Sequence, residues 1–227
     1  MSTLHLELAG VNICGVTSVQ AGRTYRGAGP RQRQDERRAR LVDAAVEVFG
    51  TTGYRSATVD RVCAVAGLTK RYFYESFDDS EALLLAAYRH SIDELHASMV
   101  AGATAGAPDD LDAMVHGGLV AFFGTIDADP RLARVAFFEI LGISEKVDAA
   151  YQTAIQRFVD TLLTLAEPAF AASALPRKDR VALAEGIVGA VLMIAQHWVV
   201  SGRSRPRAAV VRSAHTIVTA VLDKVAT

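Results

Sequence analysis

Two short helical segments that meet at a glycine most constrain what this chain can fold into. Thr58 is a good N-cap for a first short helix, and Gly67 ends that helix after Val62, Cys63 and Ala66 have formed one apolar face. Thr69 can cap a second short helix that reaches Phe77. Two helices joined by so tight a turn hold the second one away from the body, where it can enter a major groove. The segment from Thr58 to Phe77 therefore predicts a helix-turn-helix that binds DNA.

The residue types within this segment divide into an inward and an outward set. The inward set would fix the angle between the helices: Val62, Ala66, Leu68, Phe73 and Phe77. The outward set has hydroxyls for phosphate, cations for phosphate or base edges, and flat rings with a hydroxyl tip. It gives the predicted DNA contacts Thr58, Thr69, Lys70, Arg71, Tyr72 and Tyr74. For Tyr74 the alternative is a cover over the core, and for Lys70 and Arg71 it is an ordinary solvated face.

Charge is distributed unevenly along the chain, although the net charge is only −1. Residues 1–77 carry a net charge of +4, and the rest carries −5. An anionic partner is therefore expected for the first part alone. Four arginines lie just before the helix-turn-helix and could reach the DNA backbone or minor groove, or simply aid solubility: Arg31, Arg33, Arg37 and Arg38.

Helical periodicity runs through the chain from residue 35 onward, and it predicts an all-α protein. Residues 1–34 are expected to be a flexible arm, with a short strand at Leu4–Leu8. Residues 35–80 form the three-helix domain, in which Gly50 and Gly53 stop the first helix and Asp78 caps the next long one, with Glu81 completing a capping box. Residues 81–227 form a C-terminal helical domain for ligand binding and dimerisation. Its helices after the first are expected at about 110–125, 130–141 (with Asp129 as cap), 144–166, 177–201 and 206–226.

Residues 57–83 match a family pattern at many fixed positions. The run Ala-Thr-Val, four residues, Ala-Val-Ala-Gly-Leu-Thr-Lys, two residues, Phe-Tyr, two residues, Phe, three residues, Glu-Ala-Leu resembles the DNA-binding domain of the TetR family. The likeness covers roughly residues 35–90. It implies a homodimer with a ligand-gated C-terminal domain, and the same six DNA contacts. One position departs from the pattern, because Ser80 stands where the family usually has a phosphate-binding Lys; arm arginines such as Arg38 would compensate.

The C-terminal half predicts a dimer interface and an apolar pocket. Small and apolar residues surround helix 177–201, which with helix 206–226 would form a four-helix interface; burial inside one monomer is the alternative. The pocket candidates are Phe122, Phe138, Tyr151, Met193, His197 and Trp198, with Phe123, Phe137, Phe158 and Gln196 as further lining. His116, Glu139 and Gln196 are candidate polar anchors. An apolar or amphipathic small molecule is the expected effector, although core packing is an alternative for each residue.

Several classes of function lack support in the sequence. No catalytic triad spacing, glycine-rich phosphate loop or metal-binding motif is found, so no enzyme activity, metal or cofactor is expected. The two cysteines, Cys14 and Cys63, cannot make a disulfide framework, and the most apolar run, Ile187–Val200, is too short to span a bilayer. A cytoplasmic location is therefore expected. The main prediction is a ligand-responsive repressor that binds a double-stranded DNA operator; a nonspecific architectural DNA-binding protein is the alternative.

Overall fold

The computed structural model describes residues 29–106, 109–173 and 175–226, and every regular element among them is helical. The N-terminal elements are α1 (Pro30–Thr52), the 3₁₀ turn η1 (Tyr54–Ser56), α2 (Val59–Ala66) and α3 (Lys70–Tyr74). They are followed by α4 (Ser80–Thr104), α5 (Leu111–Ala128), α6 (Pro130–Arg134), η2 (Val135–Glu139), α7 (Glu145–Leu165), α8 (Glu167–Ala172), α9 (Arg177–Val200) and α10 (Arg207–Ala226). The all-α prediction is confirmed. Most of the expected arm, with its strand at Leu4–Leu8, lies outside the described residues.

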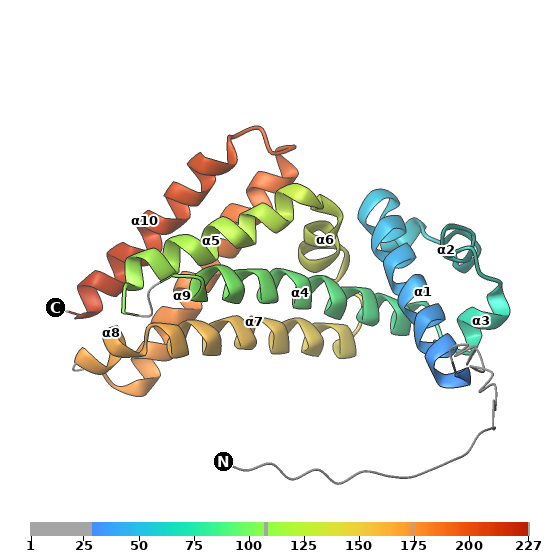
Figure 1. The fold of residues 1–227 in the computed structure, drawn as a ribbon, viewed down its shortest axis with the longest axis horizontal. Coiled ribbons are helices and arrows are strands. Elements are labelled where there is room, and N and C mark those ends of the chain that lie inside the picture. The colour runs from blue at the N-terminus through green and yellow to red at the C-terminus, as the bar shows by residue number, and fades with distance from the viewer. Residues whose placement is uncertain (1–28, 107–108, 174, 227) are drawn as a thin grey trace, which may run out of the picture.

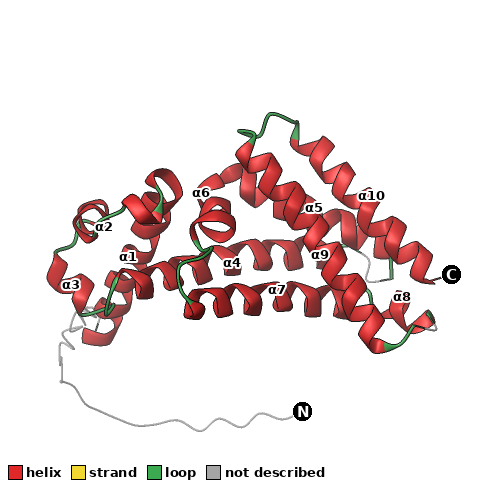
Figure 2. Ribbon diagram, turned by 180° about the vertical axis from the view of Figure 1, so that it is seen from behind, coloured by secondary structure: helices red, strands yellow, loops and turns green. Residues whose placement is uncertain are grey.

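The molecule has two parts joined by α4, as Figures 1 and 2 show. Helices α1 to α3 form a small domain at one end. The long α4 runs from this domain into a larger bundle, where it packs closely against α5 and also contacts α7. One continuous apolar core extends through both parts, from Leu41 in α1 to Leu222 in α10. Packed apolar side chains therefore connect the bundle with the small domain.

Helix α1 is longer at both ends than the sequence predicted. It begins at Pro30 rather than Asp35, because proline is tolerated in a first helical turn, where its missing N–H has no helical partner. Gly50 does not stop it. The helix continues to Thr52 and ends at Gly53, whose φ of 85° favours glycine. Gly50 serves packing instead, since a Cβ there would lie 2.5 Å from Cβ of Arg131 in α6.

Two of the predicted caps are confirmed, one is shifted by a residue, and Thr69 stands at the N-cap position of α3 without a capping hydrogen bond from its side chain. The hydroxyl of Thr58 accepts a hydrogen bond from the backbone N–H of Arg61, and a carboxylate oxygen of Asp129 accepts one from that of Arg131. For α4, however, the cap is Asp79 rather than Asp78, because Asp79 adopts the extended backbone and accepts from Ala82 N at 2.7 Å. Two adjacent aspartates offer the same side-chain chemistry, and only the backbone conformation selects between them.

The bundle contains a close helix crossing and an interrupted helix that the sequence did not reveal. Gly102 of α4 and Gly117 of α5 meet so closely that a Cβ on Gly102 would lie 2.4 Å from the carbonyl oxygen of Gly117. The segment expected as one helix at 130–141 is instead α6 followed by η2, a π-helical turn. A π-turn inside a helical run is rare and frequently occurs at a functional site. The short α8 was also not predicted.

Helix α9 has an exposed apolar surface. It is the one helix of the described chain that is long and apolar enough to cross a membrane, and only 22% of its most apolar window is buried. Met193 of α9 is 54% exposed, and nothing lies within 4 Å of a Cβ placed on Gly186 or Gly189. The alternative of full burial inside one monomer is therefore wrong for this helix. The described part of the chain leaves this surface uncovered.

Candidate functional site

The helix-turn-helix is set by a left-handed glycine and a small set of buried side chains. Gly67 ends α2 with a φ of 62°, and the chain turns directly into α3. Val62, Phe73 and Phe77 are buried in the core of the small domain, as the sequence predicted. Arg40 of α1 also fixes this turn, because its guanidinium donates to the carbonyl oxygen of Ala66 at 2.6 Å. Sequence reasoning missed that role, since the partner is a backbone atom 26 residues away.

The predicted contact residues lie on the outer side of this motif. Thr58, Thr69, Lys70, Arg71 and Tyr74 are exposed, whereas Tyr72 is half-buried with the guanidinium of Arg37 4.5 Å from its ring centre. At 61% exposure, Tyr74 is among the most exposed of the large apolar or aromatic side chains. Its hydroxyl end is available to a ligand, while its ring rests edge-on against Phe73. Only one edge of the Tyr74 ring thus packs against the core, and the rest of the side chain is exposed.

Two ion pairs hold the cations of this surface in place. Lys70 Nζ lies 2.9 Å from Asp60, and Arg71 Nε lies 2.9 Å from Glu75. The hydrogen bond with Asp60 raises the pKa of Lys70, so this side chain stays cationic at neutral pH. Exposed ion pairs contribute little to stability. Both cations can therefore exchange their carboxylate for a phosphate at small cost.

Arg38 has a different position from the other predicted contacts. Its guanidinium donates to the carbonyl oxygen of Ser76 at 2.9 Å and lies 4.2 Å from the ring centre of Phe77. These contacts join α1 to the residues that directly follow α3. Arg38 thus helps to orient the helix-turn-helix. If Arg38 also contacts DNA, it must do so with the guanidinium that already bonds Ser76.

A polar cluster connects the small domain to the bundle. One carboxylate oxygen of Glu139 in η2 accepts the backbone N–H of Tyr54 at 2.7 Å, and the other accepts Nε of Arg134 at 3.1 Å. The carboxylate lies against Gly53, where a Cβ would come within 3.2 Å of it. Arg55 adds a hydrogen bond to the carbonyl oxygen of Gly142. Hydrogen bonds from η2 and the residues after it therefore hold the 3₁₀ turn η1, which follows α1.

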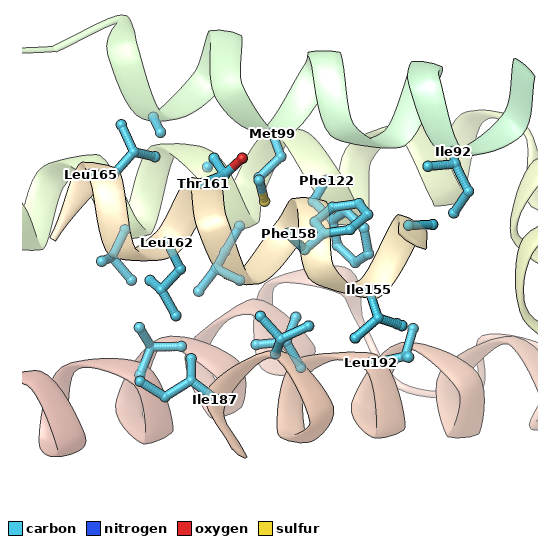
Figure 3. A pocket seen from close by; sticks show the side chains of 18 of the residues that line it. Ile92, Met99, Phe122, Ile155, Phe158, Thr161, Leu162, Leu165, Ile187 and Leu192 are labelled. Atoms are coloured by element: carbon cyan, nitrogen blue, oxygen red, sulfur yellow. The ribbon is translucent and has the colours of Figure 1, made fainter. Parts of the chain in front are cut away.

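An apolar cavity of about 120 Å³ lies inside the bundle, between α4, α5, α7 and α9. Its lining includes Ile92 and Met99 of α4, Phe122 of α5, Ile155, Phe158, Thr161, Leu162 and Leu165 of α7, and Ile187 and Leu192 of α9, which face one another in Figure 3. Protein cores are close-packed, and few voids exceed one water molecule. A void several times that size, with almost no polar lining, is suited to an apolar ligand.

The structure divides the predicted pocket residues into two groups. Phe122 and Tyr151 line the cavity, as do Phe137 and Phe158. Phe138, Phe123, Met193, Gln196, His197 and Trp198 are outside the lining. Met193 and His197 lie on the exposed side of α9, and Trp198 packs on Phe123 with its indole N–H bonded to Arg205 O. The α9 residues that do line the cavity are the less conspicuous Ile187, Val188, Val191 and Leu192.

The other polar candidates of the sequence lie away from this cavity. His116 packs edge-on against His215, which in turn lies 3.1 Å from Asp112. Among the described residues, no three metal-binding side chains come together as a site. Cys63 is buried in the small domain, and burial raises the pKa of its thiol, which disfavours the reactive thiolate.

These features define a class: a helix-turn-helix protein whose DNA-binding domain is attached to an all-helical domain with an internal apolar cavity. The family model for bacterial regulatory proteins of the tetR family matches residues 41–87. Over these residues the chain is similar to the regulators of the TetR family. This confirms the resemblance seen in the sequence.

Similar proteins include regulators with lipid-related names. The chain is 29% identical over 175 residues to the HTH-type transcriptional activator FasR of Mycolicibacterium smegmatis, covering 77% of this chain and 78% of FasR. Its fold resembles the fatty acid degradation regulator FadR of Bacillus halodurans, with a TM-score of 0.71, 18% identity, and 87% and 97% of the two chains covered. It also resembles FadR of Bacillus subtilis in complex with stearoyl-CoA, with a TM-score of 0.68, 17% identity, and 79% and 96% covered. These relatives are named as regulators and not as enzymes.

Proposed function

We propose that this protein is a cytoplasmic, homodimeric repressor that releases its operator when a long-chain acyl-CoA or a similar amphipathic molecule enters the apolar cavity. The cavity beside α4 is the observation that carries the proposal. FadR of Bacillus subtilis is described in complex with stearoyl-CoA, and an acyl chain is the apolar ligand class that fits a long, unpolar space. The α4 residues that line the cavity run from Tyr88 to Ala103, a stretch of about 22 Å at the rise of an α-helix.

The dimer part of the proposal rests on α9 and α10. Exposed apolar side chains on both helices would be covered in a four-helix interface between two copies: Met193, Val200 and Ile217. The open space at Gly186 and Gly189 allows a partner backbone to approach closely. A dimer presents two recognition helices about 34–36 Å apart, which matches successive major grooves.

The contact between Glu139 and Tyr54 offers a route from ligand to DNA. Ala136 and Phe137 of η2 line the cavity, two or three residues from Glu139. A ligand that displaces Phe137 would move the carboxylate that holds the turn after α1. A ligand shifts an equilibrium only by its difference in affinity for the two states. In this proposal the DNA-bound form needs one position of η2, and the ligand fits the cavity only when η2 has moved away from it. The ligand therefore binds the DNA-bound form more weakly.

Function is tested by binding of the purified protein to the DNA upstream of its own gene at low salt. We expect specific retention against excess bulk DNA, and release on addition of palmitoyl-CoA but not of CoA alone. Retention without sequence preference would instead favour an architectural DNA-binding protein. FasR is named an activator, so a promoter–reporter assay must distinguish the two roles. We expect deletion of this gene to raise transcription from the target promoter. Lowered transcription would show that the protein is an activator.

Lys70→Ala and Tyr74→Ala are expected to weaken operator binding, each by roughly tenfold, or about 1.4 kcal/mol, while leaving dimerisation intact. Lys70→Ala should also lower the salt slope of binding by about 1, because one phosphate contact is lost. Fluorescence anisotropy at several salt concentrations measures both effects. Lys146→Ala is the matched control, since Lys146 is exposed on α7 and outside the motif. Loss of the folded dimer in either variant would show that these residues support the core.

Glu139→Ala is expected to reduce the effect of palmitoyl-CoA on operator affinity by about fivefold or more. The variant removes the acceptor for Tyr54 N–H but leaves the cavity lining unchanged. Ligand affinity in the absence of DNA should therefore stay within about twofold of wild type, as measured by isothermal titration calorimetry. Glu145→Ala is the control, because Glu145 is an exposed carboxylate at the start of α7. Full ligand response in Glu139→Ala would exclude this contact from the coupling.

A further inference from the structure

A polar groove follows the seam between α4 and α7 and adjoins the apolar cavity. Two residues of α7, Thr161 and Leu165, line both the groove and the cavity. The rest of the groove includes His96 of α4 and amide, hydroxyl and charged side chains of α7: Gln152, Thr153, Gln156, Arg157 and Thr164. Because the same side chains face both spaces, the wall between groove and cavity is one residue thick at Thr161 and Leu165.

Few contacts close the seam at this wall. Helix α4 packs much less closely on α7 than on α5. Thr161, labelled in Figure 3, projects from α7 toward α4, where its hydroxyl lies 2.8 Å from Nε2 of His96. The buried ring of His96 also packs edge-on against Phe158, a lining residue of the cavity. The pair of His96 and Thr161 therefore stands between the groove and the apolar space.

The hydrogen bond between His96 and Thr161 joins two neutral groups. Thr161 donates its own proton to the carbonyl oxygen of Arg157, so Nε2 of His96 is the donor in this pair. Burial, with a smaller contribution from Arg157, lowers the pKa of His96, and the ring is neutral at pH 7. A neutral hydrogen bond contributes little net stability in water. The protein can therefore exchange this bond for one to a ligand at small cost.

The groove offers hydrogen bonds without an excess of charge. Arg157 pairs with Asp93 of α4, and Asp160 accepts a hydrogen bond from the amide of Gln156 at 2.9 Å. The cation of Arg157 and the anion of Asp160 thus oppose each other among the lining residues. Amide and hydroxyl side chains both donate and accept hydrogen bonds. Such a lining suits a neutral polar chain with amide and hydroxyl groups better than a bare carboxylate or phosphate.

We propose that this groove binds the pantetheine arm of an acyl-CoA, whose acyl chain reaches the cavity past Thr161. The inference rests on the proposed effector class. The cavity lining is almost entirely apolar, and a polar group buried there without a partner would be costly, so the polar part of the ligand must stay outside. The pantetheine arm bears amide groups and a hydroxyl, which match the glutamine and threonine side chains of the groove.

The test compares wild type with the double variant Gln152→Ala/Gln156→Ala, which removes two exposed amides from the groove. The probes are palmitoyl-CoA and S-palmitoylpantetheine, titrated by isothermal calorimetry. We expect the variant to bind both probes about tenfold more weakly, because hydrogen bonds to the arm are lost. Gln32→Ala/Gln34→Ala makes the same changes at exposed positions of α1 and should leave both affinities within about twofold of wild type.

Thr164→Trp provides a second, independent variant. Thr164 is an exposed groove residue outside the cavity lining, so an indole ring there obstructs the groove without entering the bundle. We again expect binding of both probes to weaken about tenfold. A thermal unfolding scan should give each variant the Tm of wild type, since the substituted side chains are exposed. Weaker binding together with a lowered Tm in both variants would indicate damage to the bundle and would count against the inference.

The other outcomes separate this inference from the proposed function. Wild-type affinity of both variants for both probes would show that the arm lies elsewhere, while the proposed function stands. Weaker binding of palmitoyl-CoA alone would assign the groove to the nucleotide and would overturn the pantetheine assignment. Absence of binding of both probes to wild type would remove the acyl-CoA effector, and with it this inference.

Discussion

Ala154→Phe is expected to lower the affinity for palmitoyl-CoA by at least about 100-fold, or about 2.7 kcal/mol, while operator binding continues in the presence of the ligand. Ala154 is buried on α7 and lines the cavity between Tyr151 and Phe158, which lie on the same face of the helix. A phenyl ring at this position would occupy the space that the ligand needs. If the proposed function holds, the variant would then remain on its operator at effector concentrations that release the wild type.

The control for this variant is Ala149→Phe, which makes the same change at an exposed position of α7. It should leave ligand affinity within about twofold of wild type. Overpacking costs about 1–3 kcal/mol in a filled core, but less where a void accepts the added atoms. A folded Ala154→Phe protein that still binds palmitoyl-CoA at wild-type affinity would show that the ligand site is elsewhere.

Gly102→Ala is expected to destabilise the fold by about 3 kcal/mol, the upper end of the usual overpacking range. A Cβ at Gly102 would lie 2.4 Å from the carbonyl oxygen of Gly117 and 2.6 Å from Cβ of Ala121. Neither is the end of a flexible side chain, so α4 and α5 must separate. For a chain of this size the loss corresponds to a fall in Tm of roughly 6–12 °C, measurable by circular dichroism.

Gly106→Ala is the matched control, because nothing lies within 4 Å of a Cβ at that exposed position. Helix propensity acts against the prediction, since alanine is favoured over glycine in a helix interior by about 1 kcal/mol. A Gly102→Ala protein as stable as wild type would therefore mean that the two helices can move apart freely. That would contradict a fixed crossing that shapes one end of the cavity, where Ala103 and Gly118 also line it.

The DNA-binding motif could be predicted from the sequence because its signals are local. Thr58 caps a helix through a hydrogen bond with Arg61, three residues away, and Gly67 adopts the positive φ that its lack of a Cβ permits. The exposed positions of Lys70, Arg71 and Tyr74 follow from the same helical period that buries Phe73. Their contacts with DNA stay predictions.

The cavity lining could be predicted only in part. Tyr151 and Phe122 were identified from their apolar character, but so were Trp198 and Met193, which pack elsewhere or face outward. Composition makes all of these residues candidates for burial. Which of them surround a void depends on how α4, α5, α7 and α9 are arranged, and no short-range pattern specifies this.

The sequence by itself therefore determined the helical class, the helix-turn-helix with its inward and outward faces, and the apolar excess of α9. Only the tertiary structure decided that Gly50 and Gly102 are packing positions, and that Glu139 binds the turn at Tyr54. The physical reason is the range of the interactions. Helices, caps and turns depend on neighbours within about four residues, whereas Glu139 and Tyr54 meet across 85 residues of chain, through packing that the whole fold must first create.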